Sequence, residues 1–275
     1  MTATENPSRP VLGRAPGPRG IVPGAVCSRR ADAEGPRSDG AVEPGRVPGH
    51  VPDQLADGVP DEVPEVEVWR PPRCPLDPGL VLRLAGHRRP AAVPPPIDDI
   101  ARRMTARADE LAAPAALLRT VRVARAEPPG ATLVGGPAFS GMAVGRLLSR
   151  CPAAVAFVLT LGPELEAEVS ALGDRREPLE AFLLDTAGWA AIEGAVRALR
   201  LELGGRARRL GWRVTHRLAP GYADWPLEEQ RLLMGLFAGA PALVRLSEHG
   251  VLVPFKSITG VFGLAAGENP RRQPP

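Results

Sequence analysis

Proline and glycine are concentrated at the beginning of this chain, and this uneven distribution limits how much of it can fold. Residues 1–92 hold many of the 33 prolines and 30 glycines, with arginines between them and almost no run of apolar residues. Such a segment cannot bury enough apolar surface to offset the entropy that is lost on ordering. We therefore predict that residues 1–92 form a disordered tail, in which the alternating stretch Glu62–Trp69 is the single candidate strand.

Residues 93–267 are rich in Ala, Leu and Val and are predicted to form one folded domain, followed by a second disordered tail at residues 268–275. A chain of this length buries about 70% of its unfolded surface. Periodicity predicts helices at 97–111, 163–172, 178–203 and 226–237, a turn and short helix within 135–150, a fully buried strand at 153–162, and further strands at 117–126, 213–218 and within 242–264. Because helices and strands mix without a regular βαβ repeat, we predict an α+β fold.

Charge and cysteine content narrow the classes of function. The net charge is +3, but the arginines are interleaved with acids, no basic helix face is evident and aromatic residues are scarce, so we expect no nucleic-acid partner. No run approaches 18 apolar residues and no signal-peptide core is visible, so we expect neither a membrane span nor export. Three cysteines without a Cys-x-x-Cys pattern predict neither a disulfide framework nor a zinc site, and they fit a reducing cytoplasm.

No standard catalytic motif is present. The stretch "GGPAFSG" lacks the Gly-Lys-Ser/Thr ending of a phosphate-binding loop, and the chain contains neither Gly-x-Ser-x-Gly nor His-Glu-x-x-His. His87, His216 and His249 are isolated in the sequence, which favours structural roles over metal binding. We therefore predict no catalytic side chain and no metal site.

The stretch "THRLAPGYADWPLEEQ" is better suited to binding. Arg217 ends a predicted strand, and its planar guanidinium can hold a carboxylate through two parallel hydrogen bonds. Pro220 fixes the path into a turn, Gly221 removes a side chain beside it, and Tyr222 can lie against a flat or sulfonium-bearing ligand. Glu193 is an unexpected acid beside a small-residue patch of the long predicted helix. Taken alone, these residues also suit an ordinary strand-to-helix connection.

Two ordered motifs add a resemblance to a known family. Arg217, Gly221 and Tyr222 match an Arg-x-x-x-Gly-Tyr signature, and Leu-Ser-Glu at 246–248 is followed by Pro-x-x-Ser-Ile-Thr-Gly at 254–260. Over residues 153–264 the chain resembles the S-adenosylmethionine-binding activation (reactivation) domain of cobalamin-dependent methionine synthase, and especially its free-standing relatives. It lacks the Asp-x-His-x-x-Gly signature of a cobalamin-binding module, so we do not expect a complete methionine synthase.

The resemblance implies that Glu193, Arg217, Pro220, Gly221 and Tyr222 bind S-adenosylmethionine, with the arginine on its carboxylate. It also implies a cobalamin cofactor carried by a partner, either a corrinoid protein or a shortened methionine synthase, and an electron donor such as a flavodoxin or ferredoxin. The chain would then be a methyltransferase component that supports reductive methylation of cobalamin. One alternative is a degenerate, non-enzymatic module that binds a corrinoid protein without S-adenosylmethionine. Another is an unrelated α+β scaffold with a proline-rich, partner-binding tail.

Overall fold

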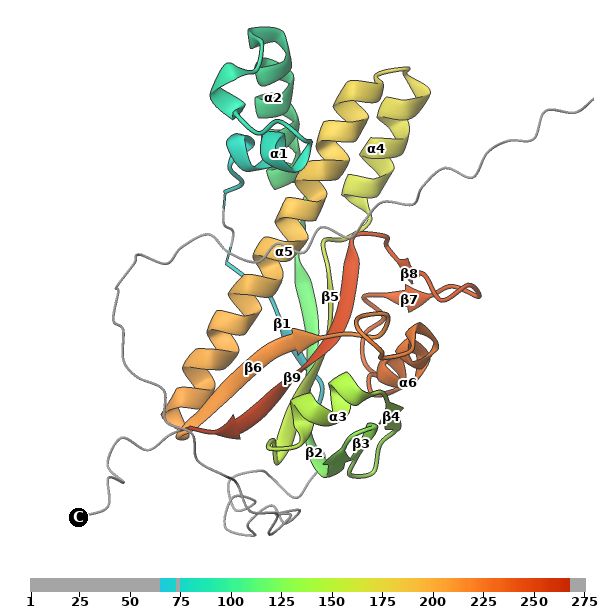
Figure 1. The fold of residues 1–275 in the computed structure, drawn as a ribbon. Helices are drawn as coiled ribbons and strands as arrows, with labels where there is room; N and C mark the ends of the chain where they lie inside the picture. Colours follow the sequence, from blue (N-terminus) through green and yellow to red (C-terminus); the bar gives the residue numbers. More distant parts are fainter. Residues whose placement is uncertain (1–64, 73–74, 268–275) are drawn as a thin grey trace, which may run out of the picture. The chain divides into compact units, whose positions relative to one another are not determined.

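The computed structural model describes residues 65–72 and 75–267 and shows an α+β fold (Figure 1), which confirms the predicted class. The main sheet is antiparallel at every pairing, has the strand order β4-β3-β2-β5-β9-β6, and carries β1 on β2. Its strands are β1 Glu67–Trp69, β2 Ala115–Glu127, β3 Gly130–Leu133, β4 Ala138–Ser140, β5 Ala153–Thr160, β6 Trp212–Leu218 and β9 Ser257–Ala266. A separate two-stranded sheet pairs β7 Arg245–Leu246 with β8 Leu252–Val253.

The helices divide between the two faces of this sheet. They are α1 Pro78–Leu84, α2 Pro95–Leu111, α3 Met142–Leu148, α4 Glu164–Asp174, α5 Pro178–Arg209 and α6 Gln230–Gly235, with 3-10 turns η2 Pro90–Ala92 and η3 Leu227–Glu229. The predictions of α2, α4 and α5 are confirmed, and α5 continues past its expected end at residue 203. Proline in the first turn of α2 and of α5 suits a helix start, where its missing N–H has no partner to lose.

The folded region begins earlier than the predicted boundary at residue 92. Within the described part of residues 1–92, β1 pairs with β2, and Val81 and Leu82 of α1 are buried in the core. Asp77 starts α1 by accepting hydrogen bonds from two backbone N–H groups of its first turn. The prediction of a structureless segment is therefore wrong for residues 78–92. What it says of residues 1–64, and of 268–275, falls outside the described residues and stays a prediction.

β5 divides the core into two halves. All eight of its residues are buried, as expected for a central strand covered on both faces. Val155 and Phe157 point to the cluster formed with α5, whereas Ala154 and Val158 point to the cluster around α3 and α6. Full burial of a side chain such as Phe157 stabilises the fold by roughly 1.5–3 kcal/mol. Elements therefore pack against both faces of the sheet.

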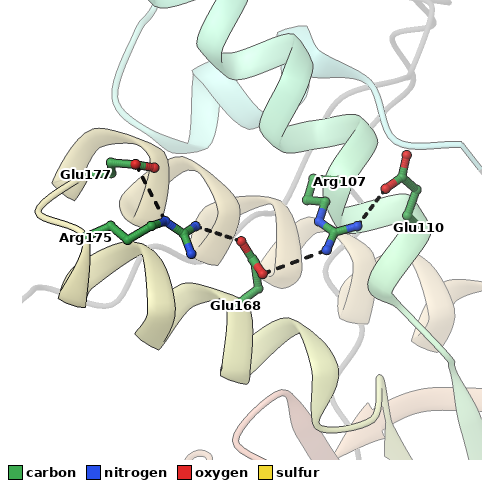
Figure 2. Close-up of polar contacts among 5 residues, drawn as sticks. All are labelled: Arg107, Glu110, Glu168, Arg175 and Glu177. Carbon is green, nitrogen blue, oxygen red and sulfur yellow. Dashed lines mark hydrogen bonds and ion pairs between the residues drawn. The ribbon is translucent and has the colours of Figure 1, made fainter.

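A chain of ion pairs links α2 to α4 and to the turn that follows α4 (Figure 2). Glu168 lies 3.8 Å from Arg107 and 3.0 Å from Arg175, Arg107 also meets Glu110 at 2.9 Å, and Arg175 lies 3.6 Å from Glu177. These groups are partly or largely exposed, and such pairs contribute about 0–1 kcal/mol each. They connect α2, α4 and the turn after α4 but contribute little to the stability of the fold. Among the described residues, no helix combines the length and apolarity needed to cross a membrane.

Candidate functional site

A β-bulge in β6 decides where the Arg217 side chain points. Val214 pairs with Leu264 and Arg217 with Phe262, so β6 has one residue more than β9 between these pairs. In a regular strand Val214 and Arg217 would face opposite ways, but the extra residue brings both onto one face. Phe262 belongs to the core cluster under α5, so that face is the α5 side. The bulge therefore directs Arg217 toward α5.

Thr215 stabilises this bulge. Its hydroxyl accepts a hydrogen bond from the backbone N–H of Gly263 at 2.8 Å, which replaces a contact that the interrupted ladder would otherwise supply. Arg200 of α5 donates from Nε to the carbonyl oxygen of Thr215 at 3.3 Å. The bulge is thereby tied both to the neighbouring strand and to the helix it faces.

Three of the five predicted site residues meet here. Arg217 Nη2 lies 3.3 Å from Glu193 Oε1 of α5, and the Arg217 Cζ atom lies 5.8 Å from the centre of the Tyr222 ring. The Arg217 side chain is 18% exposed, whereas that of Glu193 is 53% exposed. An acid, a cation and an aromatic ring that come from three separate elements thus share one place on the molecule.

The second terminal nitrogen of Arg217, Nη1, makes no hydrogen bond to any of the described residues. It is also buried. A buried donor left unsatisfied costs about 1–3 kcal/mol, so such groups are uncommon in native structures and need an explanation. A carboxylate placed beside Arg217 would satisfy this donor through the paired geometry that guanidinium groups favour.

Pro220 and Gly221 shape the loop more than they line the site. Pro220 is buried, and the backbone N–H of Gly221 is already used, because it donates to the carbonyl oxygen of Trp225 at 2.8 Å. Gly221 adopts φ +86°, a conformation that side-chain-bearing residues rarely take, and a Cβ atom there would lie 3.2 Å from Leu227. The glycine is therefore required by the turn that presents Tyr222.

Two carboxylates hold this loop against the β4–α3 connection. Asp224 accepts hydrogen bonds from the backbone N–H groups of Met142 at 2.5 Å and Ala143 at 2.9 Å, at the start of α3. The hydrogen bond from Ala143, followed by that from Met142, lowers the pKa of the Asp224 carboxyl. Glu229 accepts from Ser140, through both its N–H and its hydroxyl, and from the indole N–H of Trp225. These contacts could not be predicted from the sequence, because they join segments that are far apart along the chain.

The second motif supports the site from the neighbouring strand. A Cβ atom on Gly260 would lie 2.8 Å from the carbonyl oxygen of Leu218, so this glycine allows β9 to pack closely against the end of β6. Ser257 donates to the carbonyl oxygen of Pro254 at 2.6 Å and accepts from the hydroxyl of Thr160 at 2.8 Å, which closes the turn before β9. The motif residues therefore act on the fold and do not themselves reach Arg217.

The small-residue patch on α5 is filled by a lysine. Lys256 is buried, its Nζ lies 2.6 Å from Asp185 Oδ1 and 4.5 Å from the centre of the Trp189 ring, and its stem passes over Gly188, where a Cβ atom would lie 3.0 Å from it. The Asp185 contact is an ion pair without hydrogen-bond geometry. Phe255 lies edge-on to Trp189. This agrees with a structural role for Lys256 and puts an exposed aromatic pair one helical turn from Glu193.

The remaining candidates do not form a site. In the part of the chain that the structure covers, no three residues among His, Cys, Asp and Glu are grouped so as to hold a metal ion. Cys151 is buried, and this burial raises the pKa of its thiol to about 11, which leaves it protonated and unreactive at neutral pH. The candidate site is therefore the place where Glu193, Arg217 and Tyr222 meet.

Comparison with known proteins finds distant structural likeness but no match by sequence. No protein-family model matches the chain, and no curated protein matches it by sequence. Among solved structures, the MetH reactivation domain bound to AdoHcy is similar, with 14% sequence identity and a TM-score of 0.43. The match covers 63% of this chain and 64% of that one, so this chain spans less than two thirds of its neighbour. A likeness this weak does not establish a shared function.

Proposed function

We propose that this chain binds S-adenosylmethionine and acts as a reactivation subunit that supports reductive methylation of cobalamin on a partner protein. The observation that carries the proposal is the meeting of Glu193, Arg217 and Tyr222 around a buried guanidinium nitrogen without a partner. The family resemblance adds support, because three of the five residues that it selects converge.

The charges of the site suit those of the ligand. S-adenosylmethionine carries one carboxylate, one ammonium and one sulfonium. Arg217 would hold the carboxylate through Nη1 and Nη2, and the half-exposed Glu193 would turn to the ammonium. The exposed ring of Tyr222 would lie against the sulfonium or the adenosyl group. One fixed cation and one acid neutralise the amino-acid end of the ligand in pairs.

Under this proposal the role of the chain is to position the methyl donor. Cobalamin, carried by a corrinoid protein or a shortened methionine synthase, would supply the nucleophile once a flavodoxin or ferredoxin had supplied the electron. The sulfonium is already an activated methyl donor, so no general base is required from Glu193 or Tyr222. Holding the donor in one orientation is itself a large contribution to rate, because it removes the entropy cost of bringing the reactants together.

Calorimetric titration of the full chain with S-adenosylmethionine tests the proposal. Arg217→Ala should weaken binding by about 2–4 kcal/mol, since it leaves a ligand charge unpaired in a partly desolvated site. Arg213→Ala is the matched control, because Arg213 lies exposed on the same strand and, among the described residues, its side chain bonds only to the carbonyl oxygen of Ala266. Equal affinity of the Arg217→Ala variant and the wild type would rule out the ligand assignment.

The second candidate is an interaction module that recognises a corrinoid protein without the methyl donor. One observation favours it: Glu193 and Arg217 already pair with each other, so the charges are partly satisfied without a ligand. Capture of a purified cobalamin protein by a chain that gives no heat with S-adenosylmethionine would select this candidate over the first.

A further inference from the structure

Positive charge is concentrated on the C-terminal half of α5 and on β6. Residues 194–217 contain seven arginines and a single acid, Glu202, so this segment alone exceeds the net charge of +3 of the whole chain. Arg197, Arg200 and Arg208 are exposed at helical spacing along α5. The expectation that no helix would have a basic face is therefore wrong for α5.

Most of these arginines lack an acidic partner. Arg217 pairs with Glu193, and Arg206 pairs with Glu67 and Glu202 at 2.8 Å each. Among the described residues, no acid forms an ion pair with the other five, and we call the four of them that lie on α5 the basic face: Arg197, Arg200, Arg208 and Arg209. Like charges this close repel, so the face is stabilised by any anionic group that covers it.

One member of the basic face, Arg200, is held in a fixed position. Its Nε atom donates to the carbonyl oxygen of Thr215, which joins α5 to the edge strand β6. Figure 1 shows the course of α5 beside β6. The outer nitrogens of this guanidinium group are left for carboxylates.

The chain itself contains a complementary segment. Residues 53–67, "DQLADGVPDEVPEVE", hold six acids and no lysine or arginine, and we call them the acidic segment. Its last residue, Glu67, begins β1 and already pairs with Arg206 of α5. Residues 53–64 come directly before the described part and can extend to about 40 Å, whereas the stretch of α5 from Arg197 to Arg208 is only about 17 Å long.

We propose that the basic face binds the acidic segment of the same chain. The Glu67–Arg206 ion pair fixes the end of the segment on α5, so its remaining acids are present at an effective concentration in the millimolar range. An acidic partner in solution would have to compete with that tethered segment. Because Arg197 lies one helical turn from Glu193, the bound segment would border the candidate site, although the proposal does not depend on what that site binds.

Arginine modification by phenylglyoxal, followed by peptide mass spectrometry on the full chain, tests the contact. In 20 mM salt, Arg197, Arg200 and Arg208 should react about fivefold more slowly than in a variant whose acids are neutralised, since several weak ion pairs act together. The variant carries Asp53→Asn, Asp57→Asn, Asp61→Asn and Glu62→Gln. The same release should occur in the wild type at 1 M salt, where exposed ion pairs are screened. Arg150, exposed on a different element, is the internal reference.

A matched variant tests whether the protection depends on where the neutralised acids lie or only on the change in net charge. It neutralises four exposed acids elsewhere, namely Asp99→Asn, Glu164→Gln, Asp174→Asn and Glu228→Gln. This variant should keep the protection of Arg197, Arg200 and Arg208. Equal reaction rates in the wild type and in the acid-neutralised variant would overturn the proposal. So would protection that rises with protein concentration, because the contact would then join two copies of the chain.

Discussion

Replacement of Arg217 by methionine should make the ligand-free protein more stable. Methionine keeps an apolar stem of similar length and removes Nη1, the buried donor that has no partner. Relief of that donor is worth about 1–3 kcal/mol. Against it stand the ion pair with the 53% exposed Glu193, at most about 1 kcal/mol, and the ring contact with Tyr222, about 0.5–1 kcal/mol. The balance predicts a net gain of roughly 0.5–1 kcal/mol, or a Tm higher by about 1–4 °C.

Urea unfolding of the full chain measures this difference in the free energy of unfolding, provided that the wild type and the variant have the same m value. Arg119→Met is the matched control, because Arg119 also buries an unpaired Nε but donates from Nη1 to the carbonyl oxygen of Leu236. That variant leaves the carbonyl oxygen of Leu236 without its donor, so its free energy of unfolding should fall by about 1–2 kcal/mol. If Arg217→Met also lost more than about 1 kcal/mol, Arg217 would be a structural ion-pair residue and the reasoning from its free nitrogen would fail.

Three further predictions concern the support of the site. Thr215→Val removes the hydroxyl that accepts the hydrogen bond from the Gly263 N–H in the bulge and should cost about 1–2 kcal/mol in urea unfolding, because that donor is left without its acceptor; an unchanged free energy of unfolding would contradict the role of Thr215. Asp224→Asn should lower the Tm at pH 7. Because the folded-state pKa of Asp224 is lowered, its stabilisation exists above the unfolded pKa of about 4 and disappears as pH falls through the folded value, so a Tm difference persisting at pH 2 would refute this role. Gly260→Ala should cost about 1–3 kcal/mol in urea unfolding, since its Cβ would meet the carbonyl oxygen of Leu218; a loss near zero would show that the strands can separate freely.

The strongly periodic segments were predictable from the sequence because their burial pattern is local. α5 and β5 follow directly from the spacing of their apolar residues. The β3–β4 hairpin was missed because short strands in a Gly-Pro-rich stretch resemble a turn, and the predicted helix at 226–237 is a 3-10 turn followed by the short α6. Leu227 of the 3-10 turn is exposed, whereas Leu233, Leu236 and Phe237 are buried. Where the local sequence pattern is weak, tertiary packing determines which secondary structure forms.

The residues of the site were predictable, but their meeting was not. Arg217, Tyr222 and Glu193 stand out by residue type and by family resemblance. Simple alternation along β6, however, would have placed Arg217 on the face opposite Val214, away from α5. Only pairing with β9 reveals the bulge, and only the fold shows that Lys256, not a ligand, occupies the small-residue patch of α5.

Comparison of S-adenosylmethionine with its decarboxylated analogue tests the central claim most directly. If Arg217 holds the carboxylate, the wild type should bind S-adenosylmethionine about 2–4 kcal/mol more tightly than the analogue, and Arg217→Ala should bind both about equally. Four calorimetric titrations of the full chain complete this cycle. A wild type that does not distinguish the two ligands, or an Arg217→Ala variant that keeps the full difference, would contradict the account.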